Sequence, residues 1–125
     1  MPACEVKGTL ELGANDQQVV GIPVEEVSRK LASGASLFLL DVRDPQELSG
    51  ELGHITGVTN IPVTKLSHRL SELEEIRDRE IIAICKAGGR AHTAAQILMQ
   101  AGFPRVQVMM GGMQGWKQAG FPTEA

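Results

Sequence analysis

Two runs of apolar residues, 36–42 (SLFLLDV) and 80–84 (EIIAI), constrain the fold of this 125-residue chain more than any other feature. A strand with one face in water alternates apolar and polar residues, whereas a continuous apolar run indicates a strand that is covered on both faces. Other segments resemble shorter strands, turns or helices. The further candidate strands are 18–22, 58–61 and 105–109, and the candidate helices are 24–32, 44–48, 64–70, 91–101 and 113–119.

Strands that alternate with helices predict an α/β fold. We expect a mostly parallel central sheet of about five strands with helices on both faces. The length suits one domain, for which we expect residues 18–125, preceded by an N-terminal extension over residues 1–17 that has no clear period. Local signals predict where helices begin. Pro23 suits a first helical turn, Thr64 is expected to cap a helix, and residues 71–74 (SELE) have the spacing of a capping box.

Composition excludes several classes of function. The net charge is −3, and the chain has three Phe, one Trp and no Tyr, so neither a basic nor an aromatic surface for nucleic acid is expected. No apolar stretch approaches the roughly 20 residues of a membrane-spanning helix, so no membrane partner is expected. The histidines are too far apart in sequence to predict a metal site, and no other cofactor is predicted. They are His54, His68 and His92.

The chain has two cysteines, Cys4 and Cys85. Cys4 lies in the N-terminal extension, and we do not expect a disulfide between the two. The first residues do not show a basic segment followed by an apolar run, so no secretory leader is predicted. A reducing cytoplasm is therefore the expected location, because a free thiol persists there.

The segment CKAGGR, which runs from Cys85 to Arg90, joins a candidate strand to a candidate helix. Its two glycines let backbone N–H groups turn inward, and the helix N-terminus adds partial positive charge. The loop therefore predicts an anion-binding cradle, formed by Lys86, Ala87, Gly88, Gly89 and Arg90. A thiol at this position is expected to be reactive, which makes Cys85 the candidate nucleophile and carrier of a second sulfur atom.

Other polar residues follow the neighbouring strand, and parallel strands bring such residues to one edge of the sheet. Asp41 and Arg43 are expected to organise this edge, because a charge at a strand end needs a partner. His54 is expected to support the same edge as a hydrogen-bonded loop residue. Arg90 is expected to face the loop or a substrate, and Lys86 could attract an anion.

Four blocks of sequence occur in the order found in one protein family. The blocks are Asp41-Val42-Arg43 (D-x-R), residues 53–62 (GHITGVTNIP), the loop CKAGGR (C-x-x-G-x-R), and Gly111-Gly112 followed by Trp116 (G-G-x-x-x-W). Each block alone is weak evidence for membership of a family. In this order, over roughly residues 22–122, they make the chain resemble single-domain members of the rhodanese family of sulfurtransferases. Val58 stands where that family usually has alanine, and Ala91 where it commonly has serine.

The resemblance implies thiosulfate sulfurtransferase activity in two steps. The Cys85 thiolate would attack the outer sulfur of a small anionic donor such as thiosulfate and release sulfite. The resulting persulfide would pass its sulfur to a thiophilic acceptor. The acceptor would be cyanide or a thiol, and the expected thiol partners are glutathione, thioredoxin or a partner protein. Loop N–H groups would stabilise the anionic terminal sulfur.

Two alternatives compete with this prediction. Cysteine-dependent phosphatases and arsenate reductases also place Cys and Arg at the ends of an anion-binding loop, but that loop is one residue longer. Here four residues separate Cys85 from Arg90, and this spacing favours sulfur transfer. A persulfide carrier or docking module for a dedicated partner protein would need the same loop, so the sequence leaves that alternative open.

Overall fold

The computed structural model describes residues 18–125, so the expected extension over residues 1–17 and its Cys4 lie outside the described residues. The strands are β1 (Val20–Ile22), β2 (Leu37–Asp41), β3 (Thr59–Asn60), β4 (Glu80–Ile84) and β5 (Val106–Met109). The helices are α1 (Val24–Ala32), α2 (Pro45–Leu48), α3 (Val63–Leu66), the 3₁₀ helix η1 (Leu70–Ile76), α4 (Gly89–Gln100) and α5 (Gly112–Gln118).

The five strands form one sheet in the order β1-β5-β4-β2-β3, and every neighbouring pair is parallel. The two apolar runs of the sequence are β2 and β4, which lie side by side with Leu39 opposite Ile82. The predicted α/β fold and five-stranded sheet are thus confirmed. The sheet is wholly rather than mostly parallel.

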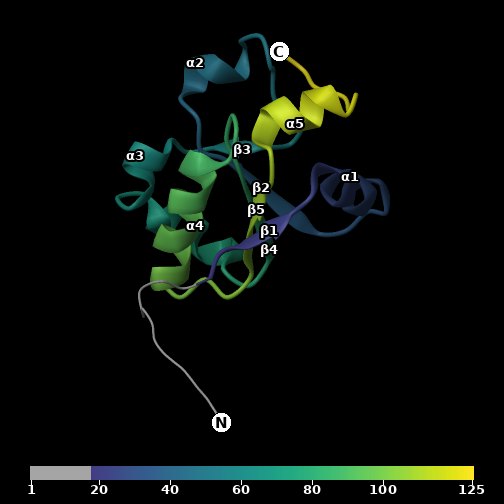
Figure 1. The fold of residues 1–125 in the computed structure, drawn as a ribbon. Helices are drawn as coiled ribbons and strands as arrows, with labels where there is room; N and C mark the ends of the chain where they lie inside the picture. Colours follow the sequence, from purple (N-terminus) through teal and green to yellow (C-terminus); the bar gives the residue numbers. More distant parts are fainter. Residues whose placement is uncertain (1–17) are drawn as a thin grey trace.

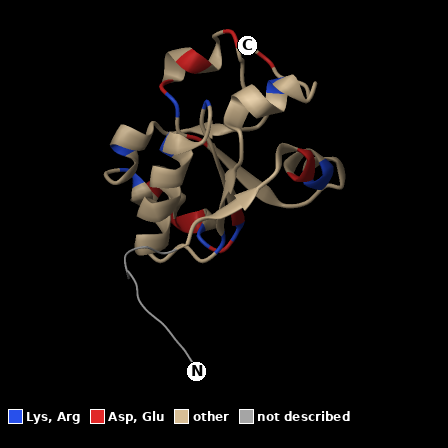
Figure 2. Ribbon diagram, in the orientation of Figure 1, with Lys and Arg blue, Asp and Glu red and all other residues tan. Residues whose placement is uncertain are grey.

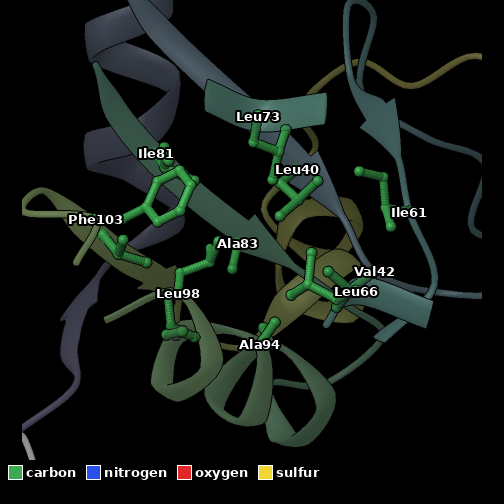
Figure 3. Packing of buried hydrophobic residues seen from close by; sticks show 14 of the residues in the cluster. Leu40, Val42, Ile61, Leu66, Leu73, Ile81, Ala83, Ala94, Leu98 and Phe103 are labelled. Atoms are coloured by element: carbon green, nitrogen blue, oxygen red, sulfur yellow. The ribbon is translucent and has the colours of Figure 1, made fainter. Parts of the chain in front are cut away.

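Helices cover both faces of the sheet, with α1 and α5 on one side and α3, η1 and α4 on the other (Figure 1). Strand β4 shows how one sequence serves both layers. Ile81 and Ala83 pack under α4, while Ile82 and Ile84 pack against the α1 and α5 side. Figure 3 shows the layer under α4, where Leu98 lies beside β4. Burial on both faces is the reason that β4 lacks an apolar–polar alternation.

Two predicted helix starts were wrong. Helix α3 begins after Pro62, so Thr64 lies inside the helix and does not cap it. Residues 71–74 lie inside η1, which begins after Arg69 without a side-chain cap. A capping box needs its Ser at the residue before the helix, whereas Ser71 is the second residue of η1. The capping box of this fold lies in α2 instead, where the Asp44 N–H donates to Glu47 Oε2 at 3.0 Å.

Candidate active site

The site lies at the carboxyl edge of the sheet, where β2, β4 and β5 end. Arg43 follows β2, Cys85 follows β4, and Gly111 with Gly112 follows β5. Because the strands are all parallel, these three connections meet at one edge. Helix α2 lies over the same edge (Figure 1). The fold therefore gathers the polar blocks of the sequence in one place.

The Cys85 side chain lies almost fully inside this edge, at 1% exposure, within the core layer beneath α4. The backbone N–H of Gly88 donates to its Sγ at 2.9 Å. Gly88 adopts φ +128°, a conformation that other residues rarely reach, and this bends the loop back over the sulfur. Helix α4 begins at the next residue, and its first N–H groups have no partner within the helix. The loop and helix end thus direct donors and partial positive charge toward this region.

Helix α5 holds the loop from the other side. The N–H of Met113 donates to the carbonyl of Cys85 at 2.8 Å, and the N–H of Gln114 donates to the carbonyl of Lys86 at 3.0 Å. A Cβ on Gly112 would lie 2.5 Å from both carbonyl oxygens, and this residue has φ +58°. Only glycine permits so close an approach. The carbonyls of Cys85 and Lys86 are therefore bound by α5, and the N–H of Gly88 is the group that contacts the sulfur.

Asp41 and Arg43 form a buried ion pair, at 0% and 1% exposure. Arg43 Nε donates to Asp41 Oδ1 at 2.9 Å, and Nη2 donates to Oδ2 at 2.7 Å. Nη2 also donates to the Gly53 carbonyl at 2.8 Å. The Asn60 amide donates to the carbonyls of both charged residues. This network fixes the chain where β2 leaves the sheet.

A second ion pair joins α2 to the start of α4. Arg90 Nη1 donates to Glu47 Oε2 at 2.7 Å, and Nη2 donates to Oε1 at 3.1 Å. The hydrogen bond from Arg90 is the main reason that the pKa of Glu47 falls from 4.5 to about 2. The same contact raises the pKa of Arg90. Both side chains are only partly buried, and charges of both signs gather where α2 meets α4 (Figure 2).

A hollow of about 170 Å³ opens between α2 and the loop; we call it the edge hollow. Its lining residues are Arg43, Glu47, Gly50, Glu51, Leu52 and Lys86. The Lys86 side chain is exposed here, whereas Cys85 lies behind the wall. The hollow thus brings together charges of both signs, and Cys85 is not among its lining residues.

Comparison with known proteins identifies the family. The model of the Rhodanese-like domain matches residues 23–119. The chain belongs to this family. The rhodanese-like domain described here is 33% identical over 104 residues to a sulfurtransferase of Allochromatium vinosum, a match that covers 83% of this chain and 94% of that protein. The resemblance inferred from the four sequence blocks is thus confirmed.

Two further relatives are similar to the rhodanese-like domain of this chain. One is a Bacillus subtilis protein named as a candidate sulfur carrier, 36% identical over 110 residues; the match covers 88% of this chain but 57% of that protein. The chain therefore spans little more than half the length of that relative. The other is the crystal structure of a rhodanese-related protein from Thermoplasma volcanium, with TM-score 0.73 and 31% identity, covering 82% of this chain and 95% of that one.

The structure brings most of the predicted site residues of the rhodanese-like domain together, but not all. The loop from Cys85 to Arg90 and the pair of Asp41 and Arg43 meet at the carboxyl edge. His54 does not line the edge hollow. Its Nδ1 lies 3.0 Å from the Leu48 carbonyl, and its backbone pairs with Glu124 near the C-terminus. It thus fixes the loop whose Gly53 carbonyl binds Arg43.

Sequence reasoning missed Glu47, Glu51 and Leu52, which form the α2 side of the hollow. A signal for Glu47 was present, because Asp44, Pro45 and Glu47 have the spacing of a capping box with proline in the first turn. No signal paired Glu47 with Arg90, 43 residues away. Ala91, where serine is common in the family, lies in the first turn of α4 and is fully buried.

The residues that the structure describes contain no group of three or more His, Cys, Asp or Glu side chains placed to hold a metal ion. None of the helices in residues 18–125 is long and apolar enough to cross a membrane.

Proposed function

We propose that this chain is a sulfurtransferase that carries sulfane sulfur as a persulfide on Cys85. The observation that carries the proposal is the contact between the Gly88 N–H and Cys85 Sγ at the start of α4. A backbone donor on the sulfur, beside the positive end of a helix, suits a site that holds negatively charged sulfur. Membership of the rhodanese-like family and the likeness to a sulfurtransferase support the same chemistry.

The first step loads the sulfur. The Cys85 thiolate attacks the outer sulfur of thiosulfate, a new S–S bond forms, and the S–S bond of thiosulfate breaks. Its electron pair leaves with sulfite, and the anionic Cys85 persulfide remains. Thiosulfate carries two negative charges, and the exposed Lys86 in the edge hollow attracts it.

The second step passes the sulfur on. The persulfide takes up a proton, and a thiolate or cyanide attacks its outer sulfur. The bond to Cys85 Sγ breaks with its electron pair left on Sγ, so the thiolate is restored. The acceptor leaves as a persulfide or as thiocyanate. A thiol that cycles in this way needs a reducing compartment, so we propose the cytoplasm as its location.

The surrounding charges act by positioning. Asp41 and Arg43 hold the end of β2, and His54 holds the adjoining loop. Arg90 neutralises Glu47, whose carboxylate would otherwise repel an anionic donor from the edge hollow. Phosphatase chemistry is disfavoured because four residues separate Cys85 from Arg90, one fewer than in the anion-binding loop of cysteine-dependent phosphatases.

A second candidate function is a persulfide carrier for a dedicated partner protein. The likeness to the candidate sulfur carrier of Bacillus subtilis favours it. The two functions predict different acceptors. An enzyme of the thiosulfate sulfurtransferase type turns over with free cyanide or small thiols, whereas a carrier loads once and releases sulfur only to its partner.

Turnover with thiosulfate and cyanide tests the proposal. The wild-type chain should form thiocyanate over many cycles, and Cys85→Ser should form none. A phosphate monoester serves as the competing substrate and should not be hydrolysed. Thiocyanate formation that persists in Cys85→Ser, or hydrolysis of the ester that depends on Cys85, would overturn the proposal.

A further inference from the structure

The C-terminal segment, residues 121–125, is tied both to α5 and to the loop that follows α2. Trp116 Nε1 on α5 donates to the Pro122 carbonyl at 2.9 Å. Glu124 pairs with His54 in an antiparallel bridge, in which the N–H of each residue donates to the carbonyl of the other at 2.8 Å. The end of the chain therefore lies against this loop (Figure 1).

The loop is shaped to receive this segment. A Cβ on Gly53 would lie 2.6 Å from the Glu124 carbonyl oxygen, and Gly53 has φ +61°, so the segment approaches as closely as only glycine permits. The Gly53 carbonyl also accepts from Arg43 Nη2 at 2.8 Å, and His54 Nδ1 lies 3.0 Å from the carbonyl of Leu48 at the end of α2. The C-terminal segment thus supports the part of the chain that positions α2.

Both ring nitrogens of His54 face hydrogen-bond acceptors. Nδ1 faces the Leu48 carbonyl, and Nε2 lies 3.4 Å from Glu124 Oε1. A neutral imidazole has one N–H, so one of the two nitrogens would turn a lone pair toward an oxygen, whereas an imidazolium has an N–H on each nitrogen. The Thr56 hydroxyl donates to the other oxygen of the Glu124 carboxylate, which orients that carboxylate. The contacts around His54 therefore suit its protonated form.

The neighbouring charged side chains have contacts of their own. These contacts are Arg43 with Asp41, Glu47 with Arg90, and Lys117 with the Glu51 carbonyl. The Glu51 side chain lines the edge hollow, which His54 does not line. Of the ion pairs formed by residues 18–125, Glu124 takes part in the one with His54. The Glu124 carboxylate is therefore the charge that the ring faces.

We propose that His54 is a proton-sensitive link that fastens the C-terminal segment, and that protonation of its ring tightens the link. The protonated ring donates to the Leu48 carbonyl and to the Glu124 carboxylate at once, so it joins the end of α2 to the end of the chain. Histidine ordinarily changes its charge between about pH 5 and about pH 8. The segment is therefore held more firmly at the acid end of that range, and its hold weakens as the pH rises. This inference does not depend on the proposed sulfur transfer.

Amide hydrogen exchange of the wild-type chain tests the inference. The N–H groups of His54 and Glu124 form the bridge, so their protection reports the equilibrium between the docked and the released segment. After correction for the intrinsic pH dependence of exchange, this protection should fall by about two- to fivefold between about pH 5.5 and about pH 7.5, because the contact that weakens is a partly exposed charge pair. Bridge amides without protection, or with protection that does not fall as the pH rises, would overturn the inference.

Three variants assign the pH dependence to its groups. His54→Gln removes the titrating ring and should abolish the fall in protection, and Glu124→Gln, which keeps the backbone bridge and the size of the side chain, should remove most of it. The matched control is His68→Gln, which makes the same change at an exposed histidine after α3 and should keep the wild-type dependence. A fall that persists in His54→Gln, or that is equally large in Glu124→Gln, would overturn the inference, as would its loss in His68→Gln. The measurement needs no sulfur donor, so its outcome is independent of the proposed function.

Discussion

Two arginine–carboxylate pairs stand on the same edge of the sheet and differ in almost every respect. Asp41 and Arg43 are neighbours in sequence, fully buried, and bound to backbone carbonyls as well as to each other. Glu47 lies on α2 and Arg90 on α4, 43 residues apart in sequence. Their side chains are 30% and 37% exposed, respectively. The first pair closes the end of β2, while the second joins α2 to the loop that carries Cys85.

The difference shows how a site can be both rigid and accessible. A buried pair is costly to break, because the partner that remains is an unpaired charge away from water. A partly exposed pair contributes little to stability, because water screens it. We infer that the buried pair serves the fold and the exposed pair serves the site.

Replacement of Arg43 by Met should have the largest effect. It leaves the Asp41 carboxylate buried without its partner and should lower the free energy of unfolding by about 3–5 kcal/mol, as measured by denaturant titration. The control is a chain that also carries Asp41→Val, in which no buried charge remains and much of the loss should be recovered. If the chain with Arg43→Met alone has the stability of the wild type, the buried pair does not serve the fold.

Gly112→Ala should have the next largest effect, because Gly112 contacts the loop that carries Cys85. Its Cβ would meet the carbonyls of Cys85 and Lys86 at 2.5 Å, so the loop must move. Sulfur transfer should fall at least about tenfold, since small misplacements of a reacting group are costly. Gly111→Ala is the matched control. It has a comparable φ of +83°, but its nearest Cβ contact outside neighbouring residues is at 3.5 Å. Equal losses in both variants would mean that backbone strain, rather than loop position, sets the rate.

Arg90→Ala should reduce activity more than Lys86→Ala. Loss of Arg90 leaves the Glu47 carboxylate in the edge hollow without its neutralising partner, so KM for thiosulfate should rise by about tenfold. Lys86→Ala removes one exposed cation and should raise it by about two- to threefold. The double variant Arg90→Ala with Glu47→Gln should recover part of the KM loss. Steady-state kinetics that give equal losses in the two single variants would contradict the ranking.

Acid should produce the smallest effect, and it should depend on Glu47. The folded-state pKa of Glu47, about 2, lies below its ordinary value of 4.5, mainly because of the hydrogen bond from Arg90. A lowered carboxyl pKa stabilises the folded state above the ordinary value, and this contribution is lost as pH falls from about 4.5 toward about 2. The stability difference between wild type and Glu47→Gln should therefore shrink over that range in denaturant titrations at several pH values. A constant difference would contradict the assignment.

The sequence predicted the layers of the fold well and the charges of the site only in part. The apolar runs that became β2 and β4 report burial on both faces, which is a local property of the chain. The contact between the Gly88 N–H and Cys85 Sγ was foreseeable, because glycines and a following helix act within a few residues of Cys85. The pair of Glu47 and Arg90 was not foreseeable, because it depends on how α2 lies over the sheet edge. The predicted cap at Thr64 was wrong because Pro62 already sets the start of α3.

The N-terminal extension over residues 1–17 and the role of Cys4 stay predictions. Among the described residues, Cys85 is a free cysteine. Its part in sulfur transfer can therefore be tested by replacing this residue and leaving Cys4 in place. The choice between enzyme and carrier depends on the acceptor, and the cytoplasmic location stays a proposal.

The most direct test of sulfur transfer by Cys85 is the mass of the intact chain after treatment with thiosulfate. The mass should increase by about 32 Da, one sulfur atom, and the increase should disappear on addition of cyanide and be absent in Cys85→Ser. Peptide mapping should place the added sulfur on Cys85. A wild-type chain with no added mass, or an adduct retained in Cys85→Ser, would show that Cys85 does not carry the sulfur.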